Sequence, residues 1–178
     1  MIKRLECIIN LCYYYNFATI RAVNMFFNNL VLKPLYGSRF VKQRASHFGI
    51  EDPYNNMVRM ENSPENGVVI TVSYILFFGW MIGLLLSLSI ILNKITSNYF
   101  YSSVFSSKLY VALSFMLTLT IPYLILKSFV LSNRRYLIYF RYFESRDKIE
   151  KDLNKNISVI IFLLTLGVIL FAFIVLLL

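Results

Sequence analysis

Very few side chains in this sequence could carry out chemistry, and their spacing leaves them without partners. His47 is the single histidine, and it stands in a basic stretch without the further ligands that a metal site needs. Cys7 and Cys12 are five positions apart, so on a helix they point in different directions. No glycine-rich loop that could cradle a phosphate is present. The sequence therefore predicts a protein that is not an enzyme, with no cofactor, no metal and no evident small-molecule substrate.

Ionisable residues inside apolar segments would be another sign of chemistry, because in membranes they mark ion paths and proton relays. The three long apolar runs of this chain contain no Asp, Glu or His. Their one charged residue, Lys127, stands a helical turn from the end of its run. This pattern argues against a proton-coupled pump.

The composition explains why apolar runs dominate. The chain has 178 residues, of which 58% are hydrophobic and 15% charged, with 18 Lys and Arg against 9 Asp and Glu. A soluble domain has roughly 45–50% apolar and about 25% charged residues. We therefore expect an integral membrane protein, and we exclude an intrinsically disordered chain and a soluble nucleic-acid binder.

We predict an all-α integral membrane protein with three transmembrane helices, at residues 66–92, 109–131 and 156–178. At about 1.5 Å per residue, each run is long enough to cross a hydrocarbon core of roughly 30 Å. The charge-poor segment at 93–108 then forms a distal, extracytoplasmic loop. A cytoplasmic amphipathic helix is expected at 132–155, and it can run into the third span because no proline separates them.

Two features of the spans point to helix packing. Gly79, Gly83 and Ser87 recur at every fourth position, which lets a second helix backbone approach closely. We call these three residues the helix-packing seam, although glycine is also common in membrane helices in general. In the second span, Pro122 removes one backbone hydrogen bond and predicts a kink, either static or a hinge.

The N-terminal residues 1–32 are predicted to form an amphipathic, interfacial helical arm, followed by a cytoplasmic connector with short helices at 33–65. The polar residues of the arm recur at steps of three, four or their multiples, which places them on one helical stripe: Lys3, Glu6, Asn10, Arg21, Asn24 and Asn28. Such a helix can lie in the membrane interface with Tyr13–Tyr15 at headgroup depth. The alternative is a fourth span, in which Arg21 would cost about 2.5–3.5 kcal/mol.

The positive charges predict the orientation. Fifteen of the 18 Lys and Arg residues lie before the first span or between the second and third, against Lys94 and Lys108 in the distal loop. The positive-inside rule then places the N-terminus in the cytoplasm and the C-terminus on the opposite face. We expect a bacterial inner membrane, with a mitochondrial inner membrane as the alternative. The residues expected at cytoplasmic lipid headgroups are Arg39, Lys42, Arg44, Lys127, Arg134, Arg135 and Arg141.

These observations predict a non-catalytic, small integral membrane subunit of a larger multi-protein membrane complex, acting in assembly or scaffolding. A secretion, conjugation, respiratory or transport machine would fit. The expected partners are the lipid bilayer, anionic lipid headgroups and other membrane protein subunits, and no nucleic acid. The alternative is a homo-oligomeric channel or membrane-perturbing effector, which the hydroxyl side chains and Pro122 of the second span would allow.

Overall fold

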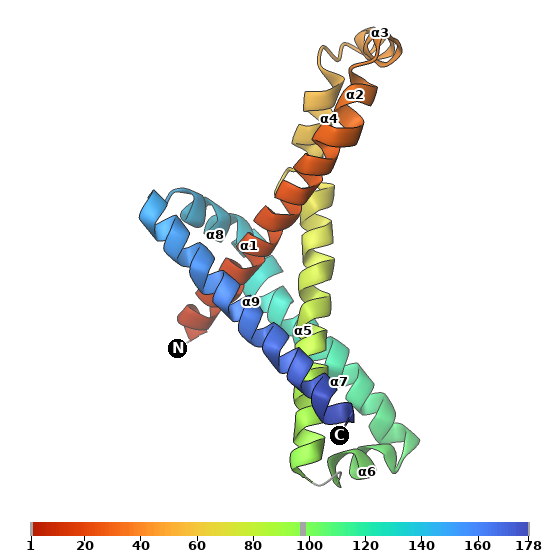
Figure 1. Ribbon diagram of the computed structural model, residues 1–178, viewed down its shortest axis with the longest axis vertical. Helices are drawn as coiled ribbons and strands as arrows, with labels where there is room; N and C mark the ends of the chain where they lie inside the picture. The colour runs from red at the N-terminus through yellow and green to blue at the C-terminus, as the bar shows by residue number, and fades with distance from the viewer. Residues whose placement is uncertain (1, 97–98, 178) are drawn as a thin grey trace. The chain divides into compact units, whose positions relative to one another are not determined.

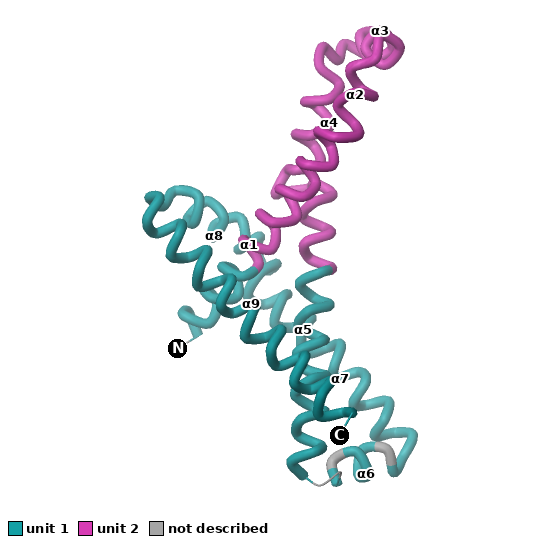
Figure 2. The backbone as a smooth tube through the Cα atoms, viewed as in Figure 1, with its two compact units in different colours: residues 1–12, 76–178 teal, residues 13–75 magenta. Residues whose placement is uncertain are grey.

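A computed structural model describes residues 2–96 and 99–177, and these are helical for most of their length, with no strand among them (Figure 1). The chain divides into two compact units (Figure 2). The first contains residues 1–12 and 76–178, and the second contains residues 13–75. Two long helices, α1 (Ile2–Phe27) and α5 (Val68–Ile95), run through both units.

Three helical segments are long and apolar enough to cross a membrane: Val68–Ile95, Lys108–Glu144 and Lys148–Leu177. The prediction of three transmembrane helices is therefore confirmed at the level of length and composition. The third segment, α9, begins eight residues before the predicted span at 156. It starts at Lys148 because Asp147 accepts a hydrogen bond from the backbone N–H of Glu150 (2.8 Å) and so caps its first turn.

The second of these segments consists of several helices. Helix α7 (Lys108–Leu126) continues through Pro122 into a wider π-helical turn, η2 (Lys127–Leu131). A short 3₁₀ turn, η3 (Ser132–Arg134), follows, and Asn133 and Arg134 both have φ of 53° there. Helix α8 (Arg135–Glu144) begins after this break. The helix expected at 132–155 is therefore divided, first by these left-handed residues and again by the turn between α8 and α9.

In the first unit, α5 packs against α9. The ring of Trp80 stacks on that of Phe162, with ring centroids 3.7 Å apart and planes at 7°. Further along, the space beside Gly83 is bounded by the Cδ1 of Ile169, 3.7 Å from where a Cβ would stand. Residue numbers rise together along both helices, so α5 and α9 run in parallel. Two membrane helices must run in parallel when one further span between them in the sequence crosses the membrane in the opposite direction, as α7 would between α5 and α9.

The distal segment 93–108 is helical rather than an open loop where the structure describes it. Helix α6 (Tyr99–Phe105) is held to the end of α5 because the Asn93 side chain accepts a hydrogen bond from the N–H of Tyr101 (2.8 Å).

The second unit contains the connector and the adjoining parts of α1 and α5. A π-helical turn η1 (Asn28–Leu32) and α2 (Lys33–Tyr36) continue α1, and α3 (Arg39–His47) and α4 (Pro53–Glu61) follow. Asp52 caps α4 by accepting from the N–H of Asn55 (3.0 Å). Tyr13, Phe17, Val69 and Ile70 are buried in this unit.

Candidate functional site: the polar face of the N-terminal helix

Helix α1 and the turn η1 that continues it bury some polar side chains while they expose large apolar ones. Asn10 is fully buried and Asn28 is 4% exposed, whereas Phe26 and Leu30 are more than 60% exposed. Polar side chains that face the protein interior are typical of helices whose outer face contacts lipid or another protein. The buried polar residues of α1 and η1 are therefore the candidate functional residues.

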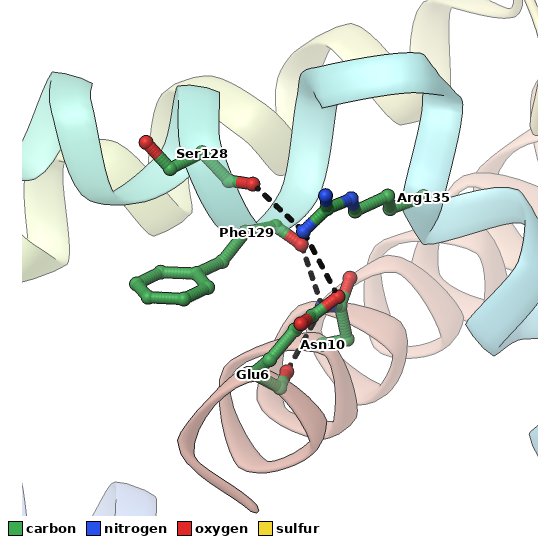
Figure 3. Close-up of polar contacts among 5 residues, drawn as sticks. All are labelled: Glu6, Asn10, Ser128, Phe129 and Arg135. Carbon is green, nitrogen blue, oxygen red and sulfur yellow. Dashed lines mark hydrogen bonds and ion pairs between the residues drawn. The ribbon is translucent and has the colours of Figure 1, made fainter. Parts of the chain in front are cut away.

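In the first unit, this polar face lies at η2, the π-helical turn that continues α7. The Nδ2 of Asn10 donates to the carbonyl oxygen of Phe129 and to that of Glu6, at 2.9 Å each (Figure 3). Beside it, Nη1 of Arg135 lies 3.3 Å from the Glu6 carboxylate and 3.4 Å from the carbonyl oxygen of Ser128 (Figure 3). Two segments that are more than a hundred residues apart in sequence are joined here.

These contacts satisfy the backbone at a helix end. The last carbonyls of a helix have no intrahelical partner, and in an apolar environment such groups are costly. The chain leaves the helix at Asn133, so the carbonyl groups of Ser128 and Phe129 need other donors. Arg135 and Asn10 supply them, and the polar face of α1 therefore acts as a cap on the second membrane helix.

In the second unit, asparagines of α1 and of the turn η1 that continues it bind two further segments. Asn16 donates to the carbonyl oxygen of Ser73 in the first turns of α5 (2.8 Å). Asn24 and Asn28 both donate to Oε2 of Glu61 in α4, at 3.2 and 2.8 Å. The asparagines of α1 thus tie the arm to the membrane helix α5 and to the connector.

The two cysteines of α1 have thiols with raised pKa values. Burial raises the pKa of the Cys12 thiol to about 11, although the Ser158 hydroxyl opposes the rise, and burial also raises the pKa of Cys7. Both thiols are therefore poor nucleophiles at neutral pH. Within residues 2–96 and 99–177, no three His, Cys, Asp or Glu side chains gather as a metal site requires.

The structure separates the three residues of the helix-packing seam. Ser87 is buried, and its hydroxyl donates to the carbonyl oxygen of Gly83 (2.8 Å). Gly83 faces Ile169 of α9, so this part of the seam packs within the chain. A Cβ on Gly79 would have no described neighbour within 4 Å. Gly79 is therefore open on its outer side.

The remaining predicted site residues are spread over the chain. Pro122 is buried within α7. Lys127 lies over the ring of Tyr123, with Nζ 5.7 Å from the centroid, and Arg44 lies over the ring of Phe40 at 5.8 Å. Six of the seven predicted headgroup cations are exposed: Arg39, Lys42, Arg44, Lys127, Arg134 and Arg141. The seventh, Arg135, takes part in the cap described above.

Sequence reasoning did not identify the asparagines as contact residues. Their spacing was visible as a polar stripe, but nothing in the sequence shows which segment that stripe meets. Tyr13, expected at headgroup depth, is 1% exposed in the structure, and its hydroxyl lies 3.5 Å from the carbonyl oxygen of Ile70. Comparison of the chain with protein-family models, curated proteins and solved structures found no match.

Proposed function

We propose that this protein is a non-catalytic, small integral membrane subunit of a larger multi-protein membrane complex, acting in assembly or scaffolding. The observation that carries the proposal is the use of polar residues in α1. Asparagines of α1 and η1 bind η2, α5 and α4, so these polar side chains serve to hold helices together. A secretion, conjugation, respiratory or transport machine would fit this role.

The open seam position supports a partner helix. Gly79 has free space outside it, and small residues let a neighbouring backbone approach closely. The hydroxyls of Ser114 and Thr118 bind backbone carbonyls one turn earlier, at 2.8 and 2.9 Å. Because these groups are used inside α7, they favour a scaffolding role over a homo-oligomeric channel.

We place α1 at the cytoplasmic surface of a bacterial inner membrane as an interfacial arm, together with α8. The cationic residues of both segments support this orientation and contact with anionic headgroups. A mitochondrial inner membrane is the alternative. Cysteines introduced at Ser102 and Ser145, in a background without Cys7 and Cys12, test the topology. An impermeant thiol reagent should label the first from outside and the second only after the membrane is opened, and the reverse pattern would overturn the orientation.

The assembly role is tested by purifying the native protein in mild detergent and identifying what accompanies it by mass spectrometry. Stoichiometric, unrelated membrane subunits would support the proposal. A ring of identical copies that conducts ions in liposomes would refute it. Gly79→Leu should reduce the yield of partners without altering folding. Gly167→Leu is the matched control, because a Cβ on Gly167 also meets no described atom within 4 Å but Gly167 lies outside the seam.

A further inference from the structure

The second unit, magenta in Figure 2, holds two adjoining pockets, and Tyr36 and Pro53 line both of them. One pocket, of about 420 Å³, follows α4 to the beginning of α5, and we call it the apolar pocket. The other, of about 380 Å³, lies between α2, α3 and the beginning of α4, and we call it the polar pocket. Both have the size of ligand sites, which usually enclose about 300–1,000 Å³.

Side chains of both charges line the polar pocket without pairing. Lys33 of α2 and Lys42 of α3 contribute two cations, and Glu51 and Asp52 contribute two carboxylates. Among residues 2–96 and 99–177, none of these four side chains forms an ion pair. Asp52 accepts hydrogen bonds from the backbone and side chain of Asn55, at 3.0 and 2.6 Å, and so caps α4. Glu51 is therefore the carboxylate that is available to a ligand.

The balance of these charges selects a zwitterion. With two cations and two carboxylates around it, the polar pocket has no net charge, so it favours neither a simple anion nor a simple cation. A molecule with a phosphate and a primary ammonium can place the phosphate beside Lys33 and Lys42. Its ammonium can then donate hydrogen bonds to Glu51, as charged donors do to carboxylates.

The apolar pocket indicates what the rest of the ligand is. Ile50, Met57, Met60 and Val68 form much of its wall, and methionine side chains adapt readily to flexible apolar groups. Met60 and Val68 are 68% and 62% exposed. Val68 is also the first residue of α5, which is long and apolar enough to span a membrane. A pocket that ends at the beginning of a membrane helix is within reach of the acyl chains around that helix.

We propose that the two pockets together bind one zwitterionic aminophospholipid. Its phosphate and ammonium occupy the polar pocket, and the upper part of an acyl chain occupies the apolar pocket. This is a site for a single lipid, recognised by both charges of its headgroup, and it differs from the attraction of scattered cations for an anionic leaflet. The inference rests on the membrane location of α5 and not on the presence of partner subunits.

Binding of defined lipids to the full-length chain tests the proposal. The chain, purified in detergent, would be mixed with equal amounts of phosphatidylethanolamine, phosphatidylcholine and phosphatidylglycerol, and its lipid complexes measured by native mass spectrometry. Phosphatidylcholine carries a quaternary ammonium that cannot donate a hydrogen bond, and phosphatidylglycerol carries no ammonium. We expect complexes with phosphatidylethanolamine to exceed each of the others by about fivefold, the effect of one exposed ion pair.

Glu51→Gln should shift the preference to phosphatidylglycerol, because it leaves the polar pocket with an excess of positive charge. Glu65→Gln is the matched control. It removes the same charge from an exposed position of the connector, but Glu65 lines neither pocket, so the preference for phosphatidylethanolamine should stay. Lys42→Gln should lower binding of phosphatidylethanolamine by up to about fivefold. Arg39→Gln, at an exposed position of the same helix outside both pockets, should leave it unchanged.

Glu51 and Lys42 are exposed, so their replacement should preserve the fold, and circular dichroism of each variant checks the helix content. A natural chain that binds the three lipids equally, or that prefers phosphatidylglycerol, would overturn the proposal. Equal effects of Glu51→Gln and Glu65→Gln would also overturn it, because the lipid would then be bound elsewhere. The assembly role could fail in the purification experiment while the lipid preference stands, so the two failures are distinguishable.

Discussion

Replacing Asn10 by Asp tests whether the capping contact at the end of α7 stabilises the fold. The substitution keeps the size of the side chain but removes the Nδ2 donor, which lies 2.9 Å from the Phe129 carbonyl oxygen. At neutral pH a carboxylate would then be buried against two carbonyl oxygens. An uncompensated buried charge typically costs about 3–5 kcal/mol. We expect Asn10→Asp to lower the free energy of unfolding by that amount.

Asn10→Leu should be far milder. It leaves the Phe129 carbonyl without a donor, which costs about 1–3 kcal/mol, but it also removes Oδ1 of Asn10, a buried oxygen without a hydrogen-bond partner in the structure. The two effects have similar size and opposite sign, so the net change should be within about 1 kcal/mol. Because both variants lack the Nδ2 donor, the difference in stability between them isolates the effect of the buried charge.

The loss in Asn10→Asp should depend on pH. Burial raises the pKa of the new carboxyl in the folded state above its ordinary value of about 3.9, because the neutral form is favoured and can donate to Phe129. Stability relative to the natural chain is then highest below pH 3.9 and falls as pH rises toward the raised folded-state pKa. At higher pH the difference is constant.

Unfolding by sodium dodecyl sulfate in mixed micelles, followed by fluorescence of Trp80, the single tryptophan, gives these free energies. Asn56→Asp, at an exposed position of α4, is the control and should change stability by less than about 0.5 kcal/mol. Equal losses for Asn10→Asp and Asn10→Leu at neutral pH would refute the reasoning. The reasoning would also be refuted if the stability of Asn10→Asp, measured relative to the natural chain, decreased as the pH falls.

Other positions give further tests. Gly67→Ala should cost at least about 2 kcal/mol, since a Cβ there would lie 2.2 Å from a backbone oxygen, whereas Gly79→Ala should be neutral or slightly stabilising; equal effects in the same unfolding assay would contradict this. Glu61→Leu should cost about 1–3 kcal/mol, because it leaves a buried asparagine amide unpaired, and no loss of stability would argue against that contact. A thiol reagent at pH 8, read out by mass spectrometry, should modify Cys7 before Cys12. The pKa of Cys12 is about 11, so its thiolate becomes abundant only near that pH, and simultaneous modification would contradict its burial.

The membrane helices could be predicted from the sequence because a long run without charges is a local property. The first span was expected from residue 66, and α5 begins at Val68. The division between α8 and α9 was missed, although its signal was present. Ser145 and Asp147 are residues that favour helix ends and N-caps, but the run without Pro or Gly suggested a continuous helix.

The role of the arm could be predicted only in part. Helical spacing showed that Asn10, Asn24 and Asn28 share a stripe, since that depends on 3.6 residues per turn. Which way the stripe faces depends on segments far along the chain, and the Phe129 carbonyl is 119 positions from Asn10. In the same way, the four-residue spacing of Gly79 and Gly83 could not reveal that only Gly83 meets α9.

The capping of α7 by α1 also has a consequence for biosynthesis. Asn10 is translated before its acceptor, and Phe129 is made 119 residues later. At about 5–20 residues per second, that interval lasts roughly 6–24 s. During this time the amide must be solvated or held by another molecule, because its native acceptor does not yet exist. The Asn10 amide thus acquires its native acceptor much later than Asn28 acquires Glu61, which is only 33 residues away, and it is exposed to the insertion machinery throughout that delay.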